Sequence, residues 1–544
     1  MRATPLGRRA PGAALFACLA GIRKPRPWMK KPPMPHSPRQ KFPPGILFLL
    51  VGLTVATMGM GLSIDAPLAQ GKGSTEEDRS NETLIEPAII SIQVTHQRGD
   101  WFSPWQRTRP SKSSGSGFLI AGGRIMTNAH VVSDAKQIVV RRNEGKRPFF
   151  AEIEFIAHDS DLAVLKVKNP AFAKGVRPLE IGPLPSLRSR VRTYGYPAGG
   201  EKISRTEGVV SRIQFITYLH PGADSHLAVQ TDSAINPGNS GGPVIQEGKV
   251  IGVAFQANTR LNDVGYFIPA PVINRFLSDI KDGTYDGYGD LGALTSNLMN
   301  PVFRDFLQLP DAETGVVVDR LLPGASGASF IFPNDVIMAV DGIPVLSDGT
   351  IKFRGYSLNY IQVVEEKQIG EQVRLTVWRD GKTVEVKFPL QKLPDAERMR
   401  SQFDTSPSYV VYAGLVFMKL DQEYLKTFGN YWEHADKHLL YRQFFFSYEN
   451  SAKSIERIVI SRVLPHPINS AYVGMVNYFV TSINGVPIER LGDVLKGFKA
   501  SRKGFHRILL DPGERILVLN AKLAERAHPV ILKRYGIRQA WRLP

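Results

Sequence analysis

Three short segments of the sequence carry side chains that together could hydrolyse a peptide bond. His130 stands in TNAHVV, Asp161 in HDSDLAVLKV and Ser240 in TDSAINPGNSGGPV. A serine hydroxyl is a poor nucleophile at neutral pH, so it needs an imidazole to take its proton and a carboxylate to orient that imidazole. The chain order His, Asp, Ser is one of the orders in which such triads occur. We therefore predict that these three residues are catalytic.

Glycines surround the predicted nucleophile in the run GNSGG. Because glycine lacks a Cβ, the backbone there can turn its N–H groups toward a developing oxyanion. We expect the amides of Gly238 and Ser240 to form that oxyanion hole. Each segment alone has an ordinary explanation, since a histidine beside a strand often packs or caps and an aspartate often begins a turn. The prediction rests on all three segments occurring in this order between short strands.

The residues around these segments are typical of a β protein. Between residues 86 and 269, short apolar runs alternate with Gly, Pro, Asn and Asp, which predicts a sandwich or a barrel. An amphipathic helix is expected at residues 271–280, and a Gly/Asp-rich connector follows at 282–290. The predicted catalytic residues thus lie in loops between strands.

The C-terminal part of the chain contains one small module twice. In residues 291–395 we expect strands, a helix at 356–366 and a hairpin with an Asp-Gly turn. The segment SINGVP at 482–487 is similar to AVDGIP at 339–344. This similarity indicates a second, diverged copy from about residue 406.

Taken together, these segments resemble the HtrA/DegP family of serine proteases. The runs GSGFLI, GYPAGG, TEGVVSRI and GYFIPA match the family as well, and SPSYVVYAGLVF at 406–417 resembles the divergent second PDZ domain of the long plant-type Deg proteases. The resemblance implies a mainly β chain: a chymotrypsin-like double β-barrel protease domain followed by two α+β PDZ-type domains. It also selects Asp161 over Asp159 as the triad carboxylate, and His130 over His158 as the base.

The residues near Ser240 indicate the substrate pocket. A trypsin-type pocket has an acid about six residues before the nucleophile, but Ala234 stands there, so cleavage after Lys or Arg is not supported. By resemblance, Ile235, Gln256 and Ala257 line the pocket. Ile235 favours an apolar substrate residue, whereas the polar Gln256 departs from that pattern and leaves the preference open.

The resemblance also implies a peptide-binding loop in the first PDZ-type domain. Its residues are Gly289, Asp290, Leu291 and Gly292. Backbone amides of such a loop hold the terminal carboxylate of a peptide that adds to a sheet edge. The second domain has Tyr409 and Tyr412 in the matching region. Their bulk predicts a filled groove, and hence a role in packing or assembly.

Residues 99–114 form an insert rich in aromatic and basic side chains. By resemblance, the matching loop of the family helps to regulate the site and contacts neighbouring subunits. The alternative is a solvated loop whose aromatic rings fold back onto the domain.

The positive charge of the chain is concentrated at its N-terminus. The net charge is +18, but ten Lys and Arg precede residue 64 and the first acid is Asp65. This distribution argues against a nucleic-acid partner, which requires a basic patch on a folded domain. Residues 45–64 carry no charge and could span a bilayer core of about 30 Å.

The basic residues before this segment predict that the rest of the chain is exported. We expect a membrane anchor or a cleaved signal, and a location on the outer side of a bacterial cytoplasmic membrane, in the periplasm or cell envelope. A transit peptide for an organelle is also poor in acids. It is disfavoured because Ser37 is the one serine before the apolar run.

These observations predict six parts: a leader at 1–44, a membrane segment at 45–64, a linker at 65–85, a trypsin-like protease domain at 86–284, a PDZ domain at 285–395 and a divergent PDZ-like domain at 396–544. No cofactor is expected. The single cysteine, Cys18, lies in the leader, which rules out a cysteine-based metal site in the main body. His434 and His438 lack a third ligand, so no metal is expected either.

The predicted function is an exported, ATP-independent endoprotease that degrades misfolded proteins. Its expected partners are unfolded polypeptides, C-terminal hydrophobic peptides bound by the PDZ domain, and the membrane. By resemblance the assembly is a homotrimer or a multiple of trimers. Two alternatives stay open: a regulatory protease that cuts one membrane or signalling substrate, and a chaperone or binding module with a latent triad.

Overall fold

The structure is a computed structural model that describes residues 84–142, 147–197, 202–257, 265–310, 314–393, 399–445, 456–500 and 503–544. The predicted leader and membrane segment fall in residues 1–83 and lie outside the described part. Within the described residues, no helix combines the length and the apolar character that crossing a membrane requires.

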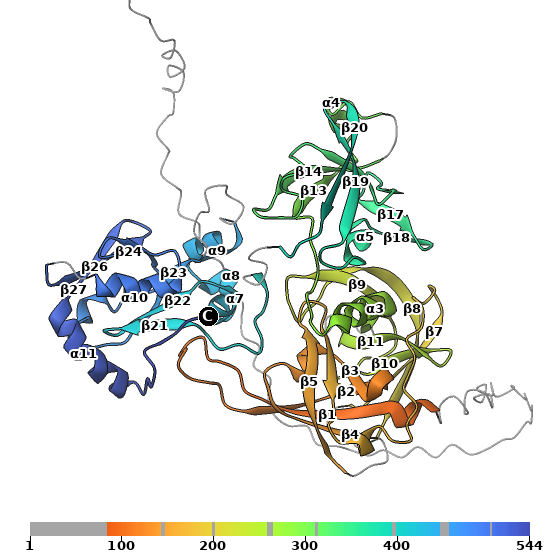
Figure 1. Cartoon of the computed structure of the whole chain (residues 1–544), viewed down its shortest axis with the longest axis horizontal. Coiled ribbons are helices and arrows are strands. Elements are labelled where there is room, and N and C mark those ends of the chain that lie inside the picture. The colour runs from red at the N-terminus through yellow and green to blue at the C-terminus, as the bar shows by residue number, and fades with distance from the viewer. Residues whose placement is uncertain are drawn as a thin grey trace, which may run out of the picture. The chain divides into compact units, whose positions relative to one another are not determined.

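The first six strands close into a barrel in the order β1-β2-β3-β6-β5-β4 (Figure 1). Their bounds are β1 Ile89–His96, β2 Ser111–Ile120, β3 Arg124–Thr127, β4 Ala135–Arg142, β5 Phe149–Ala157 and β6 Leu162–Lys166. Strand β1 shows how the sequence produces this barrel. Ile92 and Val94 are buried while Gln93 between them is exposed, because successive side chains of a strand point to opposite faces.

A second closed barrel follows in the order β10-β11-β12-β9-β8-β7. Its strands are β7 Arg190–Gly195, β8 Ser204–Thr217, β9 Ser225–Thr231, β10 Pro243–Gln246, β11 Lys249–Ala257 and β12 Gly265–Pro269. The two barrels share one apolar core that contains the fully buried Phe118 and Phe267. Helix α3, Ala270–Asp279, begins with Pro271 in its first turn and ends this unit close to where the sequence predicted. The predicted double β-barrel is confirmed.

The first C-terminal module is a sheet in the order β13-β14-β15-β19-β20. Its elements are β13 Ala293–Asn297, α4 Pro301–Phe306, β14 Val316–Leu321, β15 Val336–Val340, β16 Ile343–Pro344, β17 Thr350–Phe353, β18 Tyr356–Asn359, α5 Ile361–Glu365, β19 Gln372–Arg379 and β20 Lys382–Pro389. Of the helix expected at 356–366, the first part is the strand β18 and the second part is the helix α5. Arg354 and Gly355 have positive φ and turn the chain into the β17–β18 hairpin, and the Asn359 side chain then caps Ile361 at the start of α5.

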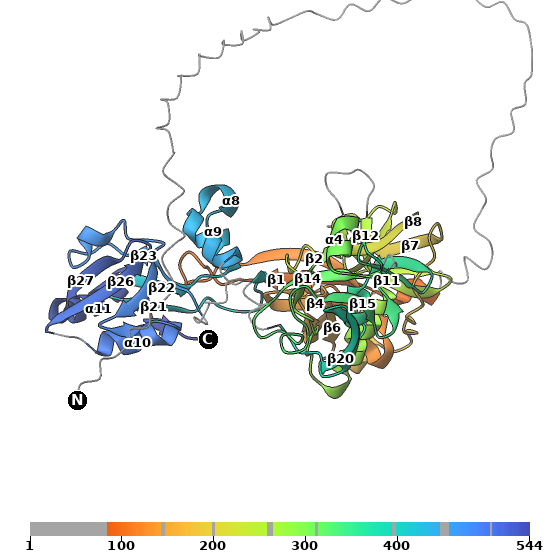
Figure 2. The ribbon, with the colours of Figure 1, turned by 90° about the horizontal axis from the view of Figure 1, so that it is seen from above.

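The second C-terminal module contains a longer sheet, in the order β27-β26-β24-β23-β22-β21-β28. Its strands are β21 Tyr409–Tyr412, β22 Leu415–Lys419, β23 Ile458–Val463, β24 Phe479–Ile483, β25 Val486–Pro487, β26 Phe505–Asp511, β27 Arg515–Asn520 and β28 Trp541–Arg542. Its helices are α7 Gln422–Lys426, α8 Tyr431–His434, α9 Lys437–Phe444, α10 Leu491–Lys499 and α11 Ala521–Arg534. Helix α10 packs against β21, β22 and β24 (Figure 2).

The two modules have the same core topology. In the first, β13, β14, β15, β19 and β20 are neighbours in that order, with the short β16 paired to β15. In the second, β22, β23, β24, β26 and β27 follow the same order, with the short β25 paired to β24. The similar sequences at 339–344 and 482–487 thus occupy matching hairpins. The repeat inferred from the sequence corresponds to a repeated structure.

A buried ion pair joins the second barrel to the first module. His226 on β9 lies 2.9 Å from the carboxylate of Glu365 on α5, and both side chains are buried. Burial opposes a charged imidazole, but Glu365 and the nearby Asp224 and Asp159 outweigh it and raise the pKa of His226 to about 9. The folded chain therefore keeps a proton here that the unfolded chain releases near the ordinary pKa of 6.5.

This ion pair predicts how stability depends on pH. The contribution of the proton on His226 is complete below pH 6.5 and is lost as the pH rises toward about 9, where folded His226 also deprotonates. The melting temperature of the chain should fall across this window, and in a His226→Gln variant it should fall less steeply. Thermal melts of both proteins at pH 6.5 and pH 9 measure the difference. Parallel slopes would show that His226 does not titrate in this way.

Candidate active site

One buried carboxylate fixes the predicted base. His130 lies in α2, Ala129–Val132, a single helical turn after β3. Asp161 lies in the turn before β6 and accepts two hydrogen bonds from His130, one from ring Nδ1 and one from the backbone N–H, both at 2.8 Å. The Asn128 side chain donates to the Asp161 carbonyl at 2.9 Å. Because Nδ1 donates to Asp161, the Nε2 atom of His130 is left to exchange a proton with another group.

The electrostatics of this pair suit a general base. Burial works against a charged imidazole, yet the charge and hydrogen bond of Asp161 outweigh it and raise the pKa of His130. Burial likewise opposes the Asp161 carboxylate, but the neighbouring His130 and His220 and the two hydrogen bonds lower its pKa. Asp161 therefore stays ionised at neutral pH and stabilises the imidazolium that forms when His130 takes a proton.

The other acid of this turn has a different environment. Asp159 accepts hydrogen bonds from the Tyr285 hydroxyl at 2.5 Å and from the Ser160 amide at 2.9 Å. It is thus engaged with the connector after α3. Of the two aspartates considered from the sequence, the structure places Asp161 against His130.

The loop that carries Ser240 is anchored on β2 of the other barrel. The Ser116 amide donates to the Ser240 carbonyl at 2.8 Å, and the Ser116 hydroxyl donates to the Gly238 carbonyl at 2.7 Å. Gly241 has a φ of 85°, and a Cβ there would lie 2.1 Å from the Ser116 carbonyl oxygen. Only glycine permits this approach, which is why the sequence reads Ser-Gly-Gly after the loop.

The amides of Gly238 and Ser240, which we predicted to form the oxyanion hole, lie in this loop. Within the described part of the chain, neither N–H donates to another group. Gly238 has a φ of 101°, a value that side chains disfavour. The Ser240 hydroxyl is 3.5 Å from the Phe255 carbonyl, and among the described residues it makes no hydrogen bond to His130. We call this position of the hydroxyl, near the Phe255 carbonyl, the resting orientation of Ser240.

The predicted pocket residues are placed only in part. Ile235 is buried and packs against β12, where a Cβ on Gly265 would lie 2.8 Å from its side chain. Gln256 and Ala257 stand at the end of β11, paired with Tyr266 and Gly265. The side chains of Gln256 and Ala257 lie outside the described part of the structure.

Two backbone amides of the predicted carboxylate-binding loop in the first module already donate hydrogen bonds within the chain. The Gly292 amide donates to the Asp290 carboxylate at 2.7 Å, and the Asp290 amide donates to the Gln391 carbonyl at 3.1 Å. Leu291 is buried, and Gly289 packs closely on Leu390. The adjacent β13 is the last strand of its sheet within the described residues. The edge is thus available, but Asp290 occupies one amide that could hold a peptide carboxylate.

In the second module, the corresponding edge is covered by the chain itself. Strand β22 takes the place of β13, and β21 pairs along it from Tyr409 opposite Met418 to Tyr412 opposite Leu415. The Tyr412 ring stacks on Phe498 of α10, with ring centres 4.0 Å apart. This arrangement agrees with the sequence-based expectation that aromatic side chains fill the groove.

The aromatic insert contacts the second module. The Arg462 guanidinium lies 4.0 Å from the centre of the Phe102 ring and also bonds to the Phe102 carbonyl at 3.0 Å. Trp101 is buried in the same cluster as Tyr409 and Tyr424. Within this chain the insert is therefore packed against the second module, and its expected contact with neighbouring subunits stays a prediction.

Sequence analysis missed His220, which lies in the turn between β8 and β9. Its ring centre is 6.2 Å from that of His130. Burial lowers the pKa of His220 to about 4, so the ring is neutral at pH 7. The surrounding residues, LHPGADS, contain no motif that could have identified it. His434 and His438 fall on separate helices, α8 and α9, and His438 bonds to the Asn477 carbonyl.

Family models of known proteins match two separate parts of the chain. A family model described as "Trypsin-like peptidase domain" matches residues 115–253, and one described as "PDZ domain" matches residues 399–541. The PDZ match thus falls on the module that we expected to be the more diverged. Among solved structures, an HtrA-type protease, AlgW with a decapeptide, is 24% identical and covers 58% of this chain and 99% of its own, with a TM-score of 0.45.

Two plant proteins are similar over most of this chain. Protease Do-like 4, mitochondrial, from Arabidopsis thaliana is 33% identical over 455 residues, which are 83% of this chain and 84% of that protein. Protease Do-like 2, chloroplastic, from the same plant is 35% identical over 470 residues, which are 85% of this chain and 76% of that protein.

These relatives correct the predicted location. The expected location, in a bacterial periplasm or cell envelope, is wrong, because the similar proteins are named as mitochondrial or chloroplastic. The error has a chemical origin. A basic, acid-poor leader is common to export signals and organellar transit peptides, so charge alone does not distinguish them. The small number of serines in the leader therefore does not exclude a transit peptide.

The similarity to the Do-like proteases and the peptidase match coincide with the double barrel that brings His130 and Asp161 together. The chain belongs to the Do-like, or Deg/HtrA, family and is a serine-type endopeptidase.

Proposed function

We propose that the chain hydrolyses peptide bonds of unfolded or misfolded polypeptides through Ser240, His130 and Asp161. The observation that carries this proposal is the buried Asp161 carboxylate with its two hydrogen bonds to His130. A site of this kind needs no metal or cofactor, because the nucleophile, the base and the oxyanion donors all come from the chain.

In the proposed mechanism, Ser240 Oγ turns from the Phe255 carbonyl toward His130 and attacks the substrate carbonyl. His130 Nε2 takes the hydroxyl proton, and the new oxyanion is held by the amides of Gly238 and Ser240. The tetrahedral intermediate collapses to an acyl-enzyme, and His130 returns the proton to the leaving amine. Water then attacks the acyl group with His130 again as base, which restores the serine and releases the acid.

The resting orientation of Ser240 favours one second candidate. A chain whose serine stays turned toward Phe255 would bind polypeptides without cutting them, as a chaperone or binding module with a latent triad. A regulatory protease with one membrane or signalling substrate would use the same chemistry on a narrower set of chains. Casein separates the candidates, since a general protease degrades it, a latent one only binds it and a specific one does neither.

We further propose that the chain works as a homotrimer or a multiple of trimers, as inferred from its resemblance to the family. The first module, with its open β13 edge, would capture hydrophobic C-terminal peptides. The second module would serve packing or assembly, since its own β21 covers the matching edge.

Removal of the nucleophile tests the proposed chemistry. Ser240→Ala should abolish casein degradation, because the attacking oxygen is lost, while the melting temperature stays close to that of the wild type. Adding His130→Ala should lower the residual rate little further, since residues of a triad act as a unit. Turnover of casein by Ser240→Ala at the wild-type rate would refute the assignment.

The two aspartates provide a matched pair. Asp161→Asn should reduce turnover by about 10⁴-fold, as loss of the carboxylate favours the wrong imidazole tautomer. Asp159→Asn should have a much smaller effect, because Asp159 bonds to Tyr285 and not to His130. Equal losses of turnover in Asp161→Asn and Asp159→Asn would mean that the triad carboxylate is misassigned.

In the wild type, kcat/KM should rise with pH to a midpoint above 6.5, since His130 acts when neutral and Asp161 raises its pKa.

The roles of the two modules can be separated by truncation. A chain that ends at Thr405 should bind hydrophobic C-terminal peptides with an affinity within about two-fold of the full chain, because the open edge belongs to β13. Its oligomer size or melting temperature should change, because the aromatic insert loses its contacts with Arg462 and Tyr409. Fluorescence anisotropy with a labelled peptide and light scattering measure the two effects. Loss of peptide binding with unchanged assembly would reverse the roles.

A further inference from the structure

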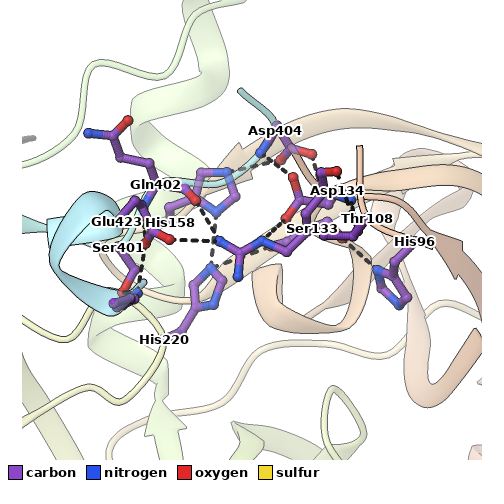
Figure 3. A network of polar contacts seen from close by, with 12 residues as sticks. His96, Thr108, Ser133, Asp134, His158, His220, Ser401, Gln402, Asp404 and Glu423 are labelled. Atoms are coloured by element: carbon purple, nitrogen blue, oxygen red, sulfur yellow. Dashed lines mark hydrogen bonds and ion pairs between the residues drawn. The ribbon is translucent and has the colours of Figure 1, made fainter. Parts of the chain in front are cut away.

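Five residues that lead into the second module, 400–404, lie against loops of the two barrels. Figure 3 shows three of them, Ser401, Gln402 and Asp404, close to Asp134, His158 and His220 of these loops. We call them the linker segment. They contact the turn after His130, the turn before Asp161 and the β8–β9 turn that holds His220. None of these contacts follows from the sequence, because the linker segment is about 240 residues from the nearest of the two catalytic turns.

The first contact fixes the turn that carries His130. Asp134 follows α2 and stands four residues after His130. Its amide donates to the Asp404 carboxylate at 2.6 Å, and the Asp404 amide donates back to the Asp134 carboxylate at 2.9 Å. Arg98 lies 3.0 Å from the Asp134 carboxylate and compensates the two neighbouring negative charges.

The second contact fixes the turn that carries Asp161. His158 stands three residues before Asp161, and its Nε2 lies 3.1 Å from the other oxygen of Asp404. Burial opposes the charge of Asp404, but the hydrogen bond and charge of His158 hold the pKa of Asp404 below its ordinary value. A single carboxylate thus ties together the turns that hold the base and its orienting acid.

The third contact is made by an aromatic ring. Phe403 stacks on His220 with ring centres 3.9 Å apart and planes 19° apart, and it also stacks on His158 at 5.1 Å. Nδ1 of His158 lies 3.0 Å from Nε2 of His220. The Arg98 guanidinium covers the Phe403 ring at 5.1 Å. The three rings form one cluster, and its His220 ring lies 6.2 Å from the ring of His130.

The linker segment is held at both ends. Arg400 makes two hydrogen bonds to the Asp224 carboxylate of the β8–β9 turn, at 2.7 and 2.6 Å. On the other side, the Gln402 amide donates to Glu423 of α7 at 3.1 Å, and Lys426 of α7 donates to the Ser401 hydroxyl at 2.8 Å. Because the segment is hydrogen-bonded to α7, a movement of the second module would displace the segment as well.

We propose that Phe403 and Asp404 are positioning residues for the His130–Asp161 pair, through which the second module sets the rate of the chemical step. This inference rests on the proposed function, because it presupposes that His130 and Asp161 are catalytic. The contacts fall three and four residues from these two side chains, so a loss of the segment changes their relative placement. A misplacement of about 1 Å in an active site can cost about 10²-fold in rate.

The test uses the full chain and a peptide substrate, with rates expressed per titrated active site. Phe403→Ala should lower kcat by about 10- to 100-fold and leave KM nearly unchanged, since the contacts of the segment are with the turns next to His130 and Asp161 and not with Ile235 of the predicted pocket. Phe403→Tyr keeps the stacked ring and should restore most of the rate. Phe505→Ala, an exposed phenylalanine on β26 of the same module, is the matched control and should behave as wild type.

A second variant guards against simple unfolding. Asp404→Asn keeps an oxygen for the Asp134 amide but removes the charge that pairs with His158, so it should lower kcat by a smaller factor at an unchanged melting temperature. If Phe403→Ala lowers the melting temperature, its kcat no longer tests the inference. The kcat of Asp404→Asn, compared with that of the wild type, then provides the test.

The outcomes separate this inference from the proposed function. An unchanged kcat in Phe403→Ala and Asp404→Asn, with Ser240→Ala inactive, would overturn the inference and leave the function intact. A higher kcat/KM in Phe403→Ala would also overturn it, because the segment would then obstruct the site instead of supporting it. Full activity of Ser240→Ala would refute the function, and the positioning role would fail with it.

Discussion

The buried carboxylate of Asp161 is the interaction on which the rest of the site depends. It binds both the ring and the backbone N–H of His130, so it fixes the orientation of the imidazole and the turn that carries it. A buried carboxylate without partners would be strongly unfavourable, and these hydrogen bonds offset that cost. The remaining contacts near the site, from Asn128 to the linker segment, hold the two turns at the separation that this pair requires.

A second constraint is the close approach of two barrels at the nucleophile loop. The carbonyls of Gly238 and Ser240 both bond to Ser116 on β2, so the serine of the second barrel is placed by the backbone of the first. Gly241 makes this possible, since any side chain there would overlap the Ser116 carbonyl.

The two C-terminal modules share one topology but differ at one edge of the sheet. Both contain the same five-strand order, yet β13 leaves an open edge and β22 is covered by β21. The covering strand brings Tyr409 and Tyr412 into the core, and the aromatic insert of the barrel packs on the same module. The second module is thereby connected to the barrels at the insert and at the linker segment. Through these two connections the second module contacts the barrel loops near His130 and Asp161.

Much of this protein could be predicted from its sequence. The three segments around His130, Asp161 and Ser240 identified the chemistry, because nucleophile, base and carboxylate must each have a definite residue type and glycines must surround the serine. Short apolar runs separated by Gly, Pro, Asn and Asp predicted a sandwich or a barrel, and the similar segments at 339–344 and 482–487 predicted the repeated module. These features are encoded within a few residues, so they can be seen without a structure.

Other features were decided only by the tertiary structure. The strand at Tyr356–Asn359 replaces half of an expected helix because a turn at Arg354 and Gly355 pairs it with β17. His220, Phe403 and Asp404 carry no motif, and they meet His158 only because loops far apart in the chain fold against one another. The resting turn of the Ser240 hydroxyl and the Asp290 bond to the Gly292 amide likewise depend on three-dimensional packing. Local patterns determine which groups are present, whereas contacts between distant segments determine how those groups are oriented.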